Sequence, residues 1–182
     1  SADAIEQYFA AVAAKSDRVK MLDLGPTTEG HRMIAAAVSS AENIRNLERI
    51  RATNARLADP RALEPDEARR LASTQKVILA IGASIHASEV GATQAASELL
   101  YTLVTASDTS TLAVLDNVVT VIIPSLNPDG ERLVNAWYER TKGTPYEGGV
   151  MPWLYQKYAG HDINRDAFMM NLVENRNLAT FM

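Results

Sequence analysis

Two side chains that could share a metal ion, His86 and Glu89, lie three residues apart, just after a predicted strand. The strand, Val77 to Ile81, is apolar throughout, which predicts that it is buried. Zinc accepts an imidazole nitrogen or a carboxylate oxygen at roughly 2.0–2.2 Å, and open α/β sheets bind ligands beyond the carboxyl ends of their strands. The alternative is structural: a histidine packed in a loop, and a glutamate in the first turn of a helix, where it complements the helix dipole.

Two more polar segments follow later in the chain. Asn127–Gly130 (Asn-Pro-Asp-Gly) comes directly after a second predicted strand, and its residue types favour a turn rather than contact with a ligand. The second segment, Asp162–Arg165, contains a carboxylate, an amide and a guanidinium. The other two histidines are His31, which follows a turn and is predicted to lie at the surface, and His161, which we do not predict to bind metal.

The elements that must position these side chains alternate between strands and helices. Two strands separated by a helix predict a βαβ unit, and therefore an α/β fold. Two earlier strands separated by a turn predict a hairpin. The predicted helices are 2–15, 42–57, 65–73, 89–106, 110–115, 131–140 and 171–182, the strands are 18–24, 33–38, 77–81 and 118–123, and 143–160 is an aromatic loop.

Length and composition exclude several classes of protein. The chain of 182 residues is long enough for one domain with a sizeable core. It contains no cysteine, so no disulfide or thiolate metal site can form. Its net charge of −4, without a dense basic patch, argues against nucleic acid as a partner, and its apolar runs are too short for a membrane span. The last predicted helix reaches Phe181 and Met182 without a stop signal, so we expect the domain to continue.

The three motifs, in this order, resemble the M14 (carboxypeptidase A-like) family of zinc carboxypeptidases, and the segment from Tyr158 to Asp166 is similar to large bacterial members. The resemblance implies that His86 and Glu89 are two of three protein ligands to a catalytic zinc ion. It implies that Asp162 hydrogen-bonds the ligating histidine, which would fix its tautomer. It also implies that Asn164 and Arg165 bind the terminal carboxylate of a peptide or protein substrate, a task suited to a guanidinium.

The resemblance further assigns an arginine to the scissile carbonyl. Arg140 is the best match, although its spacing from Asn127 differs slightly, and Arg132 is the second choice. Asp166 stands where the family has asparagine, which leaves the fine specificity open. The aromatic loop either lines a specificity pocket or packs against the core.

The family's third ligand, general-base glutamate and substrate-binding tyrosine would all follow Met182. Residues 1–182 are therefore expected to be the N-terminal part of one metallopeptidase domain, inactive alone, with a partial three-layer α/β/α fold and a mixed, mainly parallel sheet. Two alternatives remain: an aspartoacylase-like zinc deacylase, and a non-catalytic peptide-binding module. Relatives of this type are often exported, while the residues themselves leave the compartment open.

Overall fold

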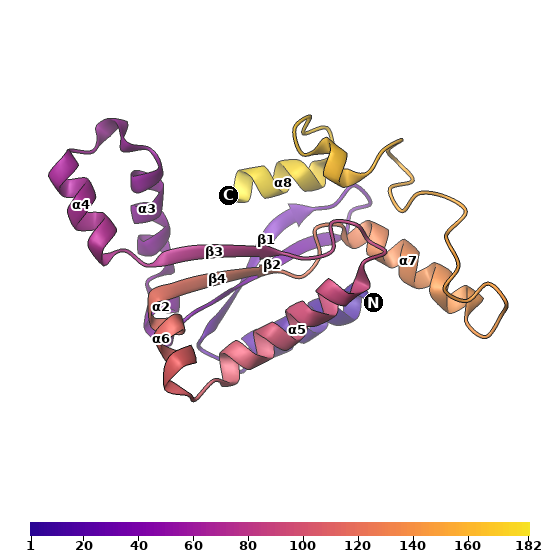
Figure 1. The fold of residues 1–182 in the computed structure, drawn as a ribbon, viewed down its shortest axis with the longest axis horizontal. Coiled ribbons are helices and arrows are strands. Elements are labelled where there is room, and N and C mark those ends of the chain that lie inside the picture. Colours follow the sequence, from indigo (N-terminus) through magenta and orange to yellow (C-terminus); the bar gives the residue numbers. More distant parts are fainter.

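A four-stranded sheet forms the centre of the molecule in the computed structural model, which describes residues 1–182 except for the side chain of residue 60 (Figure 1). The strands are β1 (Val19–Pro26), β2 (Arg32–Val38), β3 (Val77–Gly82) and β4 (Val118–Ile123), in the order β1-β2-β4-β3. The pairs β1–β2 and β2–β4 are antiparallel, and β3–β4 is parallel. The predicted mixed sheet is confirmed, but it is mainly antiparallel rather than mainly parallel, because only the βαβ crossover joins two strands in the same direction.

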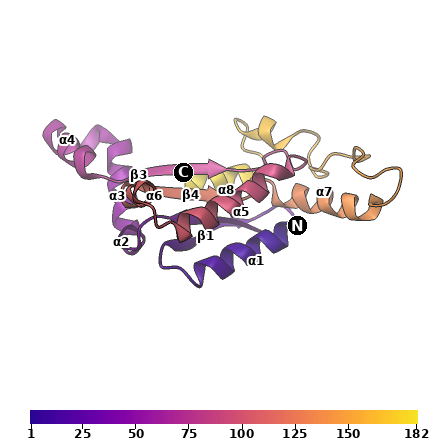
Figure 2. The ribbon, with the colours of Figure 1, turned by 60° about the horizontal axis from the view of Figure 1, so that its bottom comes forward.

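Helices cover both faces of this sheet, as the expected three-layer fold requires. Helices α1 (Ala2–Ala13) and α5 (Val90–Thr105) lie on one face, and α8 (Val173–Phe181) lies on the other (Figures 1 and 2). The alternation of side chains along β2 serves both layers. Ile34, Ala36 and Val38 pack with α1 and α5, whereas Met33, Ala35 and Ala37 pack in the cluster that α3 and α8 border.

Strand β3 is the main departure from the sequence prediction. Its apolar pattern predicted a buried strand, yet all of its residues are exposed, with Val77 at 59% and Leu79 at 48%. Strand β3 lies at the edge of the sheet, where β4 is its only strand partner among the described residues, and no described helix packs extensively against either of its faces. Strand β4, by contrast, has a neighbour on each side, and only its first residue is not buried.

Most remaining elements match their predicted positions. The predicted helix 42–57 is divided at Asn46 into α2 (Ala41–Arg45) and α3 (Leu47–Ala58), and Ser40 caps the first part. Helix α7 begins three residues earlier than predicted, at Pro128, because Asn127 caps it. The others are α4 (Pro65–Thr74), α6 (Thr109–Asn117), and the short 3₁₀ helices η1 (Pro60–Ala62) and η2 (Ile163–Asp166).

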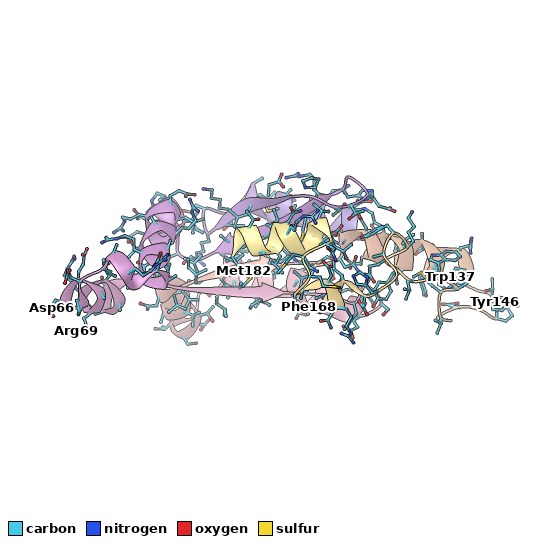
Figure 3. All side chains as sticks on the ribbon, turned by 90° about the horizontal axis from the view of Figure 1, so that it is seen from above. Asp66, Arg69, Trp137, Tyr146, Phe168 and Met182 are labelled. Carbon is cyan, nitrogen blue, oxygen red and sulfur yellow. The ribbon has the colours of Figure 1, made fainter. Side chains whose placement is uncertain are left out.

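The molecule is elongated, with different elements at its two ends. Helices α3 and α4 project from one end, where Asp66 and Arg69 lie, and α7 with the 143–160 loop forms the other, where Trp137 and Tyr146 lie (Figure 3). Within the described part of the chain, no helix combines the length and apolar character that crossing a bilayer would need.

Candidate functional site

The loop after β3 is held in an unusual backbone conformation. Ser84 has φ 48°, in the left-handed region that residues other than glycine rarely adopt. Its hydroxyl donates to the carbonyl oxygen of Glu89 at 2.9 Å and accepts a hydrogen bond of 2.8 Å from the hydroxyl of Thr93. Both Ser84 and Thr93 are buried. This chain of hydrogen bonds joins the start of the loop to its end and to α5, and so fixes the turn that carries His86.

The Asn127–Gly130 segment forms the predicted turn and also supports this loop. Asn127 is fully buried; its Oδ1 accepts from the amide of Gly130 at 3.1 Å, and its Nδ2 donates to the carbonyl oxygen of Ile85 at 3.4 Å. A Cβ at Gly130 would lie 2.7 Å from the Asn127 side chain and 2.9 Å from the Cβ of Ala87. The turn after β4 therefore packs directly against the residues on either side of His86.

His31 lies at the surface, as its position after a turn predicted, but it is paired there with an aspartate. Its Nδ1 is 2.7 Å from Oδ1 of Asp129, and its side chain is 38% exposed. Asp129 is buried, and also accepts from the hydroxyl of Thr27 at 2.8 Å and from the amide of Glu29 at 2.9 Å. His31 therefore belongs to a network around the buried Asp129 that ties the β1–β2 turn to the first turn of α7.

The Asp162–Arg165 segment, 76 residues or more beyond His86, is brought against it. Oδ2 of Asp162 is 3.7 Å from Nε2 of His86, and Nδ2 of Asn164 is 3.2 Å from the same nitrogen. The hydroxyl of Tyr155 donates to Oδ2 of Asp162 at 3.3 Å. Burial, together with the neighbouring Asp162 carboxylate, raises the pKa of Tyr155 to about 12, so the phenol remains a donor at neutral pH.

Asp166 faces the protein interior rather than a ligand. It is fully buried, and its carboxylate accepts from the amides of Leu172 and Asn171 at 2.8 and 3.1 Å and from Nδ2 of Asn175 at 3.1 Å. Burial raises the pKa of Asp166, but these hydrogen bonds outweigh it, so the pKa lies below its ordinary value. Asp166 thus anchors the turn that carries its neighbour, Arg165. Arg165 itself is exposed, and has no ion pair within the described residues.

The geometry around His86 tests whether a zinc ion fits. Nδ1 of His86 is 3.2 Å from Oε2 of Glu89. Two ligands in a tetrahedral zinc site, with bonds of 2.0–2.1 Å, are about 3.3 Å apart, so the two atoms already have the separation that a shared ion requires. A neutral imidazole carries one N–H. If that proton is on Nε2, the nitrogen nearer Asp162, then Nδ1 presents a lone pair on the side of Glu89. In the other tautomer, Nδ1 would donate to Glu89 and Nε2 would accept from Asn164.

His86 and Glu89 therefore fit as two members of a ligand set, and Asp162 fits as the carboxylate that orients the imidazole. Within the described part of the chain, no group of three histidine, cysteine, aspartate or glutamate side chains could hold a metal ion. The third ligand has no candidate there.

The two arginines considered for the carbonyl are both engaged elsewhere. The Arg140 guanidinium carbon lies 4.9 Å from the ring centre of Trp137 and 5.9 Å from that of Trp153. Arg132 donates to Asp3 at 2.5 and 3.1 Å and to the carbonyl oxygen of Pro128 at 3.2 Å. The structure does not bring either one to His86 through a hydrogen bond or ion pair between described residues.

Sequence reasoning did not identify three residues that shape this site. Tyr155 was noted only as part of an aromatic loop, although a tyrosine seven residues before Asp162 was the available signal. Ser84 and Thr93 gave no signal, because a left-handed serine and its hydrogen-bonded threonine look like any loop and helix residues. The site that results is a histidine between two carboxylates and beside the Asn164 amide, with the exposed Arg165 next in the chain.

Comparison with known proteins gives a consistent result. Residues 5–177 match the family model of the zinc carboxypeptidases, Peptidase M14. A metallo-carboxypeptidase from Burkholderia cenocepacia has a similar structure, with a TM-score of 0.60 and 19% identity over 96% of this chain and 35% of that one. Carboxypeptidase A from Helicoverpa armigera gives a TM-score of 0.53 and 15% identity over 97% of this chain and 40% of that one. No curated protein matches the sequence. The chain thus spans 35–40% of the length of these two solved structures.

Proposed function

Because the chain belongs to the zinc carboxypeptidase family, we propose that residues 1–182 form the N-terminal part of a catalytic domain that hydrolyses C-terminal peptide bonds. The observation that carries this proposal is the placement of His86, with Glu89 at 3.2 Å from one ring nitrogen and Asp162 at 3.7 Å from the other. A metal-binding histidine with a carboxylate behind it would have this arrangement, which supports the proposal.

Each residue of the cluster then has a distinct task. His86 and Glu89 would hold the zinc ion, which would supply a Lewis acid and lower the pKa of a water molecule. Asp162, whose Oδ2 is 3.7 Å from Nε2 of His86, is assigned the proton of that nitrogen, which would keep Nδ1 free as a ligand, and Tyr155 holds Asp162 in place. The Thr93–Ser84–Glu89 hydrogen bonds keep the loop rigid.

Substrate binding is assigned to the exposed end of the same segment. Arg165 and Asn164 bind the terminal carboxylate of a peptide, so that its last bond is presented to the metal, a positioning effect. Arg165 suits this task because it is exposed and its guanidinium offers a bidentate donor. Arg140 is assigned to the scissile carbonyl; since it lies over Trp137 and Trp153, it must leave these rings when substrate binds.

Zinc binding tests the metal assignment directly. Zinc is titrated into the chain in competition with a coloured chelator. Binding should be weak, because known zinc sites use three or four protein ligands, and His86→Ala or Glu89→Gln should weaken it at least tenfold. His31→Gln, a change at a histidine outside the cluster, is the control and should have no effect. Equal affinity in all four proteins would refute the metal assignment.

Hydrolysis tests the reaction and must be measured on the longer protein. A peptide with a free C-terminus should be cleaved, and the same peptide with a C-terminal amide should not. Replacing Arg165 by alanine should raise KM for the free peptide far more than it lowers kcat. Faster hydrolysis of an N-acyl amino acid would instead support a deacylase, and binding of the peptide without cleavage would support a non-catalytic module.

A further inference from the structure

Helix α7 and the loop that follows it form one end of the molecule (Figures 1 and 3). A groove of ≈ 1000 Å³ is lined there by α7 and residues 148–155. The start of α5 forms its other wall, where Ser88 and Val90 lie on either side of Glu89 in the sequence. Tyr155, which bonds to Asp162, also lines it. The groove therefore begins beside the candidate metal centre, and its volume matches that of binding sites for ligands of peptide size.

Aromatic rings make up much of this groove. The rings of Trp137 and Trp153 meet edge to face, with centres 5.8 Å apart, and the indole N–H of Trp137 donates to the carbonyl oxygen of Gly149 at 3.0 Å. This bond ties the loop to α7. The guanidinium of Arg140 over both rings shows that these indoles accept a cation on their faces.

The charged side chains that line the groove are acidic. Glu131 and Glu139 are among its lining residues, and no lysine or arginine is, among the residues the structure describes; Ser1, at the amino terminus, also lines it. Glu131 is only 6% exposed, and its Oε2 is buried without a hydrogen-bond donor from any described residue. A buried carboxylate with an oxygen left without a donor is costly, and a cationic group in the groove would offset its charge.

We propose that this groove binds a basic side chain, lysine or arginine, of the peptide substrate. The cationic head bonds to Glu131, and the aliphatic stem lies against the tryptophans. The inference rests on the proposed function only in taking the peptide as a substrate, because binding in the groove needs neither the metal nor cleavage.

The two tryptophans of the chain both line the groove, so intrinsic fluorescence reports on it directly. Three blocked tripeptide amides, identical except for a central arginine, norleucine or glutamate, are titrated into metal-free protein. The arginine peptide should change the fluorescence saturably, with a Kd at least tenfold lower than that of the norleucine peptide. Glu131→Gln should reduce this preference to less than threefold, while Glu98→Gln, at an exposed acid of α5 outside the groove, should leave it intact.

The norleucine peptide also shows whether the variant is folded, because its apolar contacts do not involve the carboxylate. Glu131→Gln should bind it as the parent protein does and should keep the parent's circular dichroism. Equal Kd values for the arginine and norleucine peptides, or a preference that survives Glu131→Gln, would overturn the proposal. So would the absence of any saturable change with the arginine peptide. None of these results depends on zinc or on hydrolysis, so they leave the proposed function standing.

Discussion

Replacing Asp166 by asparagine tests how the substrate-facing segment is held. Asparagine is nearly the same size and is the residue that relatives were expected to have here, so the substitution would cost little stability if this side chain lay at the surface. In this structure, however, Asp166 is fully buried and accepts three hydrogen bonds, from the amides of Leu172 and Asn171 and from the side chain of Asn175. The asparagine amide would place an NH₂ group against at least one of these donors.

The expected loss of stability follows from these contacts. A hydrogen bond to a charged group contributes about 1.5–3 kcal/mol, and a buried donor left without a partner costs about 1–3 kcal/mol. Losing one such bond and weakening the others from charged to neutral should lower the free energy of unfolding by roughly 2–4 kcal/mol. With a urea dependence of about 2 kcal/mol per molar, the unfolding midpoint should fall by roughly 1–2 M.

Urea unfolding, followed by circular dichroism at neutral and at acid pH, measures this effect and its charge dependence. The pKa of Asp166 is lowered in the folded protein, so its charged form stabilises the fold. This contribution is complete above the unfolded pKa, near 3.9, and is lost as the pH falls through the folded value. The parent and Asp166→Asn proteins should therefore differ at neutral pH and converge in acid.

Asp17→Asn is the matched control, because Asp17 is exposed and makes no side-chain hydrogen bond to another described residue. It should leave the midpoint unchanged. If Asp166→Asn also leaves the midpoint unchanged, or if its deficit persists in acid, then the buried carboxylate does not anchor this turn and the reasoning fails.

Two other predictions concern the site itself. In the parent protein, the tyrosinate absorbance of Tyr155, identified by its loss in Tyr155→Phe, should appear with a pKa near 12. Asp162→Asn should lower this pKa but leave it above 10, because burial, the largest cause of the shift, remains. Since the folded pKa of Tyr155 exceeds its unfolded value of about 10, its stabilising contribution should be complete below pH 10 and lost as the pH rises toward 12, a loss absent in Tyr155→Phe. Gly130→Ala should destabilise the fold by about 1–3 kcal/mol in urea unfolding, because its Cβ would overlap Asn127 and Ala87; Gly91→Ala, whose Cβ meets no atom within 4 Å, is the control and should be nearly neutral.

Local patterns in the sequence accounted for most elements of the fold. The βαβ unit, the hairpin and the helices were predictable because apolar periodicity and turn residues act over a few neighbouring positions. The exposure of β3 was not, because it depends on which elements pack against the two faces of that strand. The same limit applies to α7, whose early start at Pro128 required Asn127 to act as a cap.

The candidate site divides in the same way. Residue types alone nominated His86, Glu89 and Asp162, since few side chains bind zinc or orient its ligands. Asp166 looked like a substitution at a specificity position, and only the folded chain showed that it is buried and anchors the turn.

By itself, the sequence determined the class of fold and the kinds of group available for chemistry, because both depend on residue identity and short-range spacing. The tertiary structure alone decided that Asp162 and Asn164 meet the His86 ring, that His31 pairs with Asp129, and that Glu131 lies buried beside a groove lined with tryptophan. These pairings join residues that are far apart in the chain. The packing of the sheet and its helices sets the distances between them, and no local pattern encodes that packing.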